Sequence, residues 1–385
     1  MPKYSMLDLF CGAGGMSVGF EQAGFKAVAA NDIWPIATET FGINHPNTTV
    51  ITGDITNPKI QGQIIEATHG KVDVIVGGPP CQAYSLAGNR DPDDPRGKLF
   101  EEYVKIVSKL MPPIFVIENV KGLLTMMHFK EGLSAKEESE LAALRAEEAQ
   151  IQEAISSSKQ LPRSEWDALK ASERQIANRL RHYKEPVTDL ISRRFKKLGY
   201  SVKWKLLNAA DYGVPQLRER VFIIGTLNGV KFDFPEPTHS ESGIIGVTGK
   251  KLPKWVSIGE ALRGLPDPKE NQNDDLFEGS FSSIYLSRNR RKEWNEPSFT
   301  IQAGARHAPL HPSSPRMRKV STDNWEFESE RGIRRLSFLE IARIQTFPDS
   351  YKFAGKTADR YTLIGNAVPC SLAKKVAEQV KLALF

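Results

Sequence analysis

Residues 7–15, LDLFCGAGG, decide the fold of this chain. The apolar run 6–10 predicts a short strand, the glycines after it break the strand, and a helix can begin behind them. Small residues at such a turn let a ligand approach the backbone and the first amides of the helix. The motif therefore predicts a site for a nucleoside cofactor, and by itself it fits a nicotinamide enzyme equally well.

Three further β-rich runs continue the alternation of strands and helices. They cover 26–30, 72–76 and 114–117, and polar residues follow them, including Asp32 and Glu118. The pattern predicts an α/β fold with a doubly wound, mostly parallel sheet, whose ligands bind at the carboxyl ends of the strands. Asp32 can then accept hydrogen bonds from ribose hydroxyls, or it can cap the next helix.

Residues 134–185 interrupt the alternation with two amphipathic helical patterns, and Pro186 ends the second. Ser164 is placed to cap the second helix. Apolar residues recur at heptad a and d positions, with one glutamate in each seam: Leu141, Leu144, Glu148, Ile151 and Ile155, then Trp166, Leu169, Glu173, Ile176, Leu180 and Tyr183. We expect an inserted antiparallel hairpin that covers its own apolar faces, in preference to a dedicated partner site.

Composition and charge narrow the class of protein. The chain has 385 residues, of which 40% are hydrophobic and 25% charged, as in ordinary globular proteins. No apolar run approaches the length of a membrane helix, and the start MPKYSMLDLF lacks the features of a signal peptide, so we expect a cytoplasmic protein. The net charge of +6 permits a nucleic-acid partner without establishing one.

Three cysteines at wide spacing, Cys11, Cys81 and Cys370, predict neither a disulfide framework nor a metal site. Cys81 stands in GGPPCQAYS (77–85), after an apolar strand, two glycines and two prolines. A lone cysteine is usually a small core residue. Because the stiff turn and the polar residues Gln82 and Ser85 are not typical of a core, Cys81 is interpreted as a nucleophile.

A carboxyl and two arginines complete the candidate chemistry. Glu118 ends the strand at 114–117, on the sheet edge expected for Cys81, where it suits general acid work or a satisfied structural role. QLRER (216–220) is predicted to place Arg218 and Arg220 on one face of a strand, since side chains alternate along strands. Arginine forks suit carbonyl or phosphate oxygens, and exposed surface arginines are the alternative.

Taken in order, these motifs resemble the cytosine-5 DNA methyltransferases of bacterial type. The set comprises LDLFCGAGG, the acid at 32, GDI at 53–55, GGPPCQAYS, ENV at 118–120, QLRER, RRLSFLEIARIQTFP at 334–348 and GNAVP at 365–369. The resemblance implies the class I S-adenosylmethionine-dependent methyltransferase fold and a sequence-specific enzyme that methylates carbon 5 of a flipped cytosine. It also implies catalytic roles for Cys81 as nucleophile at carbon 6, Glu118 at the base ring, Arg220 at the base carbonyl and Arg218 in support.

By the same resemblance, S-adenosylmethionine is the cofactor and no metal is needed. The family often has an aromatic residue directly after the ribose-binding acid, whereas here Ile33 holds that position and Trp34 follows it. The residues implied to bind the cofactor are Phe10, Gly12, Gly14, Asp32, Ile33, Asp54, Pro79, Leu99 and Asn366.

Three segments follow from the resemblance: a catalytic domain at 1–230 that carries the insertion 134–185, a loop-rich, β-containing target-recognition domain at 231–335, and a returning segment at 336–385. The run 282–312 resembles domains that recognise GGCC or GGNCC. Guanine offers two acceptors that match an arginine fork. The candidate DNA-binding residues are Gln82, Ser85, Arg288, Arg290, Arg291, Thr300, Arg306 and His307.

Three alternatives are weighed against this function. A tRNA methyltransferase of the same fold carries a Cys-Phe-Thr signature in its recognition region, and 231–335 contains no cysteine. A nicotinamide oxidoreductase would not explain the PPC, ENV and QLRER motifs. A non-catalytic DNA-binding relative would be expected to lack Cys81 or Glu118, and both are present. We therefore expect a monomeric enzyme on double-stranded DNA, associated with the nucleoid, which works in a restriction-modification system beside an endonuclease that it does not contact, or as an orphan epigenetic methylase.

Overall fold

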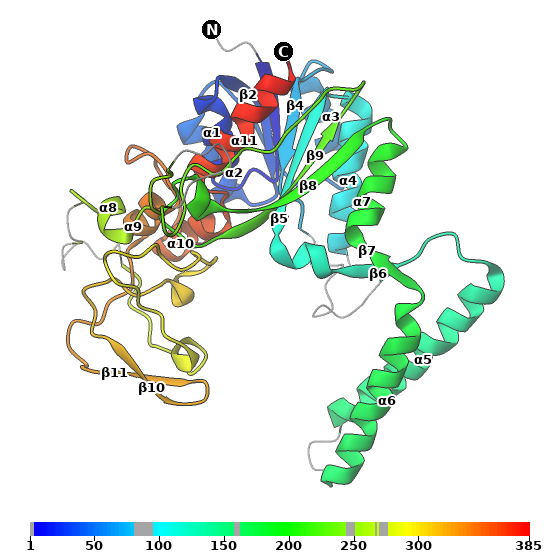
Figure 1. Cartoon of the computed structure of the whole chain (residues 1–385). Helices are drawn as coiled ribbons and strands as arrows, with labels where there is room; N and C mark the ends of the chain where they lie inside the picture. Colours follow the sequence, from blue (N-terminus) through cyan, green and yellow to red (C-terminus); the bar gives the residue numbers. More distant parts are fainter. Residues whose placement is uncertain (1–3, 81–94, 158–161, 244–250, 266–267, 269–275) are drawn as a thin grey trace. The chain divides into compact units, whose positions relative to one another are not determined.

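The computed structural model describes residues 4–80, 95–157, 162–243, 251–265, 268 and 276–385, with the backbone alone at 95–98 (Figure 1). The chain divides into two compact units. One comprises 1–80, 98–121 and 195–385, and the other comprises 81–97 and 122–194.

A seven-stranded sheet, ordered β3-β2-β1-β4-β5-β9-β8, forms the centre of the first unit. Its strands from β3 to β5 pair in parallel, whereas β9 is antiparallel to both of its neighbours. The mostly parallel sheet predicted from the sequence is therefore confirmed. The strands are β1 (Tyr4–Leu9), β2 (Phe25–Asp32), β3 (Thr49–Thr52), β4 (Val74–Gly77), β5 (Ile114–Val120), β8 (Ser201–Asn208) and β9 (Glu219–Thr226).

Helices cover both faces of this sheet (Figure 1). On one face α1 (Gly15–Gln22) packs against α11 (Cys370–Ala383), with alternate strand residues such as Val116 beneath them. On the other face Tyr103 of α4 (Pro95–Leu110) donates its hydroxyl towards the carbonyls of Ile75 and Val116, at 3.1 and 3.2 Å. Flanking the strands are also α2 (Pro35–Asn44) and α3 (Pro58–Ala67).

A second core joins residues of the predicted recognition domain to the returning segment. Ile301, Ala305 and Ala308 pack there with α9 (Phe338–Ile344) and α10 (Thr357–Asn366). Ser337 and Glu340 form a capping box that starts α9. The short helix α8 (Ile258–Ala261) belongs to the same core.

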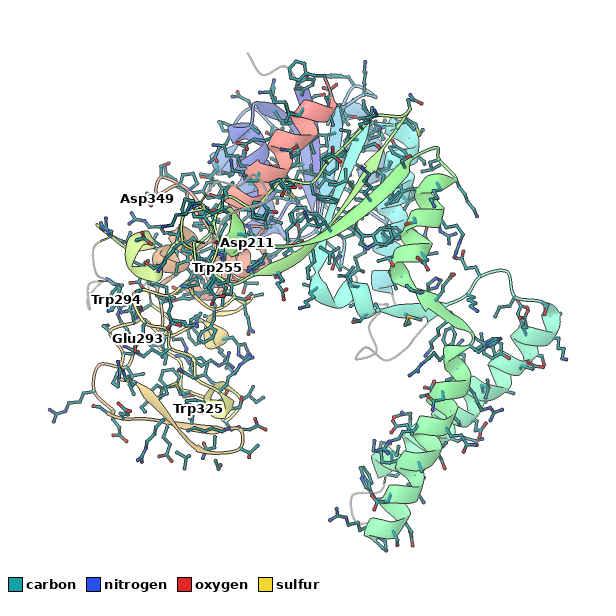
Figure 2. All side chains as sticks on the ribbon, in the orientation of Figure 1. Asp211, Trp255, Glu293, Trp294, Trp325 and Asp349 are labelled. Carbon is teal, nitrogen blue, oxygen red and sulfur yellow. The ribbon has the colours of Figure 1, made fainter. Side chains whose placement is uncertain are left out.

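The loop-rich part of 231–335 has a small core of its own beside one antiparallel pair, β10 (Met317–Ser321) and β11 (Asn324–Phe327). Trp325 of β11 packs against buried Tyr285, Leu310 and Met317 (Figure 2). Elsewhere in this region Trp255 donates its ring N–H to Asp211 Oδ1 at 2.9 Å, which fastens a long loop to the residues before β9 (Figure 2).

The second unit contains the inserted hairpin, α5 (Ala135–Ser157) and α6 (Arg163–Arg181). The short antiparallel pair β6 (Met127–Phe129) and β7 (Lys184–Pro186) brackets the hairpin along the chain, and α7 (Val187–Lys196) follows. The core of the hairpin consists of Leu144, Ile176, Leu180 and Tyr183. The two helices thus bury part of each predicted seam against each other.

Three details of the hairpin prediction are wrong. The second helix begins at Arg163, with Pro162 at its N-cap position and no side-chain capping bond, so Ser164 is not the cap. Trp166 is 37% exposed and lies outside the hairpin core. The helix ends at Arg181, because the chain turns into β7 before it reaches Pro186.

Among the helices of the described residues, none is both long and apolar enough to cross a membrane. The boundaries 1–230, 231–335 and 336–385 stay a prediction.

Candidate functional site

The turn between β1 and α1 has one open side and one closed side. Phe10 and Gly12 adopt left-handed backbone angles, with φ of 58° and 51°. A Cβ built on Gly12 meets no described atom within 4 Å, whereas one built on Gly14 lies 2.8 Å from the Tyr351 hydroxyl. The predicted cofactor residue Gly12 therefore faces space that no described residue fills, whereas Gly14 is enclosed by described side chains.

Asp32 ends β2 and bridges two turns. Its Oδ2 accepts from the backbone N–H of Gly12 and its Oδ1 from that of Trp34, both at 2.9 Å. Burial raises the pKa of this half-buried carboxyl, although the bonds from Trp34 and Gly12 act in the opposite direction. Asp32 does not cap α2, whose N-cap residue is Trp34 without a side-chain capping bond. The ribose contact stays a prediction, which the geometry permits because each carboxylate oxygen has a second lone pair that can accept from a ligand hydroxyl.

The two candidates for an apolar contact with an adenine differ in exposure. Ile33 is 64% exposed, whereas Trp34 packs against the second core. Of these two side chains, the exposed one is thus the isoleucine.

The other predicted cofactor residues come from neighbouring segments. Asp54 is exposed two residues after the end of β3, and the backbone N–H of Gly53 donates to the Asp32 carbonyl at 2.9 Å. Leu99 is half-buried in α4, and Asn366 is exposed at the end of α10. These residues and the glycine turn offer hydroxyl acceptors, an apolar side chain and open backbone, which are the groups needed to hold a nucleoside cofactor.

Glu118 lies in β5 with its side chain paired to Arg220 of β9, whose Nε is 2.8 Å from Oε1. Both side chains are largely buried. Burial raises the pKa of the Glu118 carboxyl, although Arg220 and Arg218 lower it. A carboxyl with a raised pKa holds its proton to a higher pH than a solvent-exposed one, which suits it to general acid work.

The same corner holds the segment that leads to Cys81. A Cβ built on Gly78 would lie 3.4 Å from Glu118 Oε2, and Asn119 donates its side-chain amide to the Pro79 carbonyl at 2.9 Å. The GGPP and ENV motifs are therefore adjacent. The buried Pro79 contributes its carbonyl to this clamp.

Arg218 differs from Arg220 in its surroundings. It precedes β9, so the expectation of two arginines on one face of a strand is wrong. The Arg218 guanidinium is 1% exposed and donates to three backbone carbonyls, those of Ile301, Gly365 and Ala367, at 2.7 to 3.0 Å. Burial lowers its pKa to about 9. All three acceptors are protein carbonyls, so the side chain joins three chain segments together.

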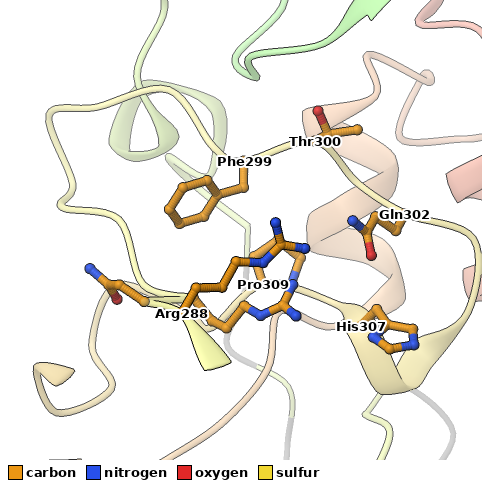
Figure 3. Close-up of a pocket in the computed structure, with 8 residues that line it drawn as sticks. Arg288, Phe299, Thr300, Gln302, His307 and Pro309 are labelled. Carbon is orange, nitrogen blue, oxygen red and sulfur yellow. The ribbon is translucent and has the colours of Figure 1, made fainter. Parts of the chain in front are cut away.

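Several predicted DNA-binding residues line one pocket in the first unit (Figure 3). Arg288 is exposed there, whereas Arg290 is buried and donates to the carbonyls of Tyr285 and Ile284. Arg291 lies outside the pocket and bonds Glu293 and nearby carbonyls. The lining residues are Arg288, Asn289, Arg290, Phe299, Thr300, Gln302, His307 and Pro309.

Two further members of the predicted set differ in their contacts. Arg306 is exposed outside the pocket lining. Thr300 donates its hydroxyl to the Leu217 carbonyl. This bond links the segment around Thr300 to the QLRER segment.

Cys81, Gln82 and Ser85 lie outside the described residues. The other two cysteines, Cys11 and Cys370, are buried free thiols. Burial raises the pKa of both, which disfavours the thiolate.

The sequence of the chain matches a known protein family. The family described as C-5 cytosine-specific DNA methylase matches residues 4–139 and 177–382. The chain belongs to this family. It is a DNA cytosine-5 methyltransferase, an enzyme that uses S-adenosylmethionine to methylate carbon 5 of cytosine. The unmatched residues 140–176 coincide with most of α5 and α6, so the hairpin is additional to the family pattern.

Two curated relatives match over nearly their whole length. The chain is 38% identical to the Type II methyltransferase M.MthTI of Methanothermobacter thermautotrophicus, with 97% of this chain and 96% of that protein covered. It is 36% identical to M.FnuDI of Fusobacterium nucleatum, with 98% and 94% covered.

Solved structures share the fold at lower identity. They include a DNMT2 mutant of Spodoptera frugiperda (TM-score 0.59, 18% identity, 100% of both chains covered) and the methyltransferase EhMeth of Entamoeba histolytica (TM-score 0.59, 15% identity, 100% of both covered).

Sequence patterns missed two residues of this methyltransferase that the fold brings to the site. Asp8 is 1% exposed beneath the glycine turn and accepts from the Ser17 hydroxyl at 2.6 Å. An acidic residue inside an apolar strand was the available signal. Tyr351 donates to the Ala13 carbonyl from 338 residues away, and no local pattern indicates that contact.

Proposed function

We propose that this enzyme methylates cytosine within a specific duplex sequence through a covalent bond between the Cys81 sulfur and carbon 6 of a flipped base. Attack by the thiolate makes carbon 5 nucleophilic, so that it takes the methyl group that S-adenosylmethionine supplies when bound. Loss of the carbon-5 proton and of the sulfur then restores the aromatic ring. Flipping is required because carbons 5 and 6 cannot be reached within the base stack.

The observation that carries the proposal is the Glu118–Arg220 pair beside the GGPP segment. Glu118 Oε1 engages Arg220, and Oε2 is directed towards Gly78, three residues before Cys81. In this assignment the carboxyl contacts N3 and the amino group of the base, and Arg220 holds the base carbonyl. Arg218, whose hydrogen bonds go to the protein itself, acts in support.

Elimination of the other cysteines also supports Cys81. Cys11 and Cys370 are 7% and 0% exposed, and burial disfavours ionisation of both thiols. Cys81 is the one cysteine left in the sequence to act as a nucleophile.

A duplex containing 5-fluorocytosine tests the mechanism, since fluorine cannot leave carbon 5 as a proton. Wild type should form a covalent adduct that survives denaturing electrophoresis, and Cys81→Ser should form none while it still binds DNA. Glu118→Gln should slow adduct formation on the order of 10²-fold or more. Glu219→Gln is the matched control, because Glu219 is the neighbour of Arg220 but pairs with Lys121 at the surface. Turnover that survives in Cys81→Ser would refute the mechanism.

For DNA recognition we propose that Arg288 and Arg306 contact bases or phosphates directly. Their exposure supports this role. Arg290 and Arg291 are held by protein carbonyls and Glu293, so they shape the surface, with Thr300 and His307 alongside.

Replacing a base-reading arginine should relax specificity at one base pair by about 1–3 kcal/mol, whereas loss of a phosphate contact should weaken all sequences alike. Arg318→Ala is a suitable control, since Arg318 is 69% exposed on β10 and paired with Glu326. Uniform weakening by both Arg288→Ala and Arg306→Ala would refute base reading by either residue.

The motif in 282–312 and the Type II names of the relatives support a role in restriction-modification with GGCC or GGNCC as the site. Bisulfite sequencing of a host genome that expresses the chain tests the recognition sequence, and methylation at sites without adjacent guanines would contradict it. The second candidate function is that of an orphan methylase. A gene for an endonuclease of the same specificity beside this gene would favour restriction-modification, and its absence would favour the orphan role. A monomeric state, an endonuclease without direct contact and a location at the nucleoid stay predictions.

A further inference from the structure

Three hydrogen-bonded polar side chains, one exposed and two buried, lead to the glycine turn from outside the family motifs at that turn. His45, just after α2, has its Nδ1 3.0 Å from Glu21 Oε2 in α1 and its Nε2 3.2 Å from the Tyr351 hydroxyl. Tyr351 in turn donates to the backbone carbonyl of Ala13 at 2.5 Å. The His45 side chain is 2% exposed and Glu21 is 37% exposed, so the chain extends from solvent to the turn.

The hydrogen-bond roles follow from the groups that can only accept. The Ala13 carbonyl accepts, so Tyr351 donates its one hydrogen there. Burial raises the pKa of the Tyr351 hydroxyl, which therefore keeps that hydrogen. The tyrosine oxygen can then accept from Nε2 of His45, while the Glu21 carboxylate accepts from Nδ1.

Packing holds this chain in one arrangement. The His45 ring lies 4.2 Å from the Phe41 ring, and the Tyr351 ring lies 4.8 Å from that of Phe347, measured between centroids. At Gly14 a Cβ would approach the Tyr351 hydroxyl to 2.8 Å and His45 Nε2 to 3.0 Å. The polar groups therefore sit directly against the turn, where they leave no room for a side chain at position 14.

We propose that Glu21, His45 and Tyr351 are positioning residues that hold the Ala13–Gly14 peptide, and with it the open side of the turn at Gly12, in the shape that binds S-adenosylmethionine. The inference rests on the proposed assignment of the cofactor to this turn. None of the three residues needs to touch the cofactor. Their contribution appears in cofactor affinity, because an unclamped turn must be ordered when the cofactor binds.

Tyr351→Phe tests the proposal, since it removes one hydroxyl and keeps the ring. In the full-length enzyme, calorimetry with S-adenosylhomocysteine should give a Kd about threefold to tenfold higher than wild type, the range expected for one buried hydrogen bond. The KM for S-adenosylmethionine should rise similarly, while kcat at saturation and the KM for DNA change by less than about twofold.

Tyr200→Phe is the matched control, because Tyr200 is also buried and donates its hydroxyl to a backbone carbonyl, that of Pro112, at the opposite end of β5 from Glu118. It should lower stability comparably without changing Kd. Equal Kd changes in both variants, or no change in Tyr351→Phe, would overturn the proposal.

Glu21→Gln provides a second route if Tyr351→Phe folds poorly, because Glu21 is partly exposed. It should raise Kd by a smaller factor, and the double variant should lose little more than Tyr351→Phe alone, since linked groups act as a unit. Additive losses, or an unchanged Kd in Glu21→Gln, would contradict a linked chain. Failure of wild type to bind S-adenosylhomocysteine would instead refute the cofactor assignment itself.

Discussion

Asp8 predicts a specific dependence of stability on pH. Its carboxyl is 1% exposed in β1 and accepts from the Ser17 hydroxyl at 2.6 Å. Burial raises the pKa of Asp8 from 3.8 to about 7, and the negative charges of Asp32 and Glu21 act in the same direction. The folded enzyme therefore holds this proton to near-neutral pH, whereas the unfolded chain releases it at much lower pH.

The sign follows from this difference in bound protons. Well below pH 3.8 the carboxyl is neutral in both the folded and the unfolded state, so it does not change the free energy of unfolding. Between pH 3.8 and 7 the unfolded state ionises first, so folding loses stability as pH rises, and above 7 the loss is constant. A pKa raised from 3.8 to about 7 corresponds to about 4 kcal/mol, an upper estimate for one buried group.

Asp8→Asn removes the titration and keeps an acceptor for Ser17. Relative to wild type, the variant should become more stable as the pH rises. Between pH 4 and pH 8.5 its free energy of unfolding should gain up to about 4 kcal/mol on that of wild type. Urea denaturation across this range measures it. The change with pH is the test, because the buried amide N–H groups add a cost that does not depend on pH.

Asp233→Asn controls for the altered net charge, because the Asp233 side chain is 93% exposed. It should show a nearly constant difference from wild type. A constant difference in Asp8→Asn as well would refute the raised pKa, and growing destabilisation of that variant at high pH would reverse its sign.

Three further outcomes are expected. Arg218→Met should lower the free energy of unfolding by about 3–5 kcal/mol, because it strands three buried carbonyls, and a small loss in chemical denaturation would contradict that role. Asp32→Ala should weaken binding of S-adenosylhomocysteine by about 1–3 kcal/mol. It should also lower Tm, since the Asp32 carboxylate accepts from the backbone N–H groups of Gly12 and Trp34. If calorimetry shows an unchanged affinity, Asp32 has only a structural role. Replacing 134–182 by a short Gly/Ser linker keeps the β6–β7 pair. Because the hairpin has its own core, bisulfite sequencing should show methylation with an unchanged sequence preference. A folded variant without methylation would assign the hairpin a part in binding DNA or a partner.

Local sequence was sufficient for features that depend on periodicity and turn chemistry. The apolar runs that precede the glycines of CGAGG, Asp32, GGPP and Glu118 predicted parallel strands. Strands buried on both faces appear in a sequence as short apolar segments bounded by turn or polar residues. The hairpin followed from its heptad spacing. Its cap did not, because Pro162 precedes Ser164 and the helix starts one residue after that proline.

Tertiary structure decided which of two similar side chains meets which partner. Arg218 and Arg220 stand two residues apart in one motif, yet one binds backbone carbonyls up to 149 residues away and the other pairs with Glu118. Likewise Tyr351 reaches Ala13 across 338 residues, and Trp34 packs in a core while Ile33 is exposed. Spacing along the chain determines which face of a helix or strand a residue occupies, whereas the partner on that face depends on how distant segments pack.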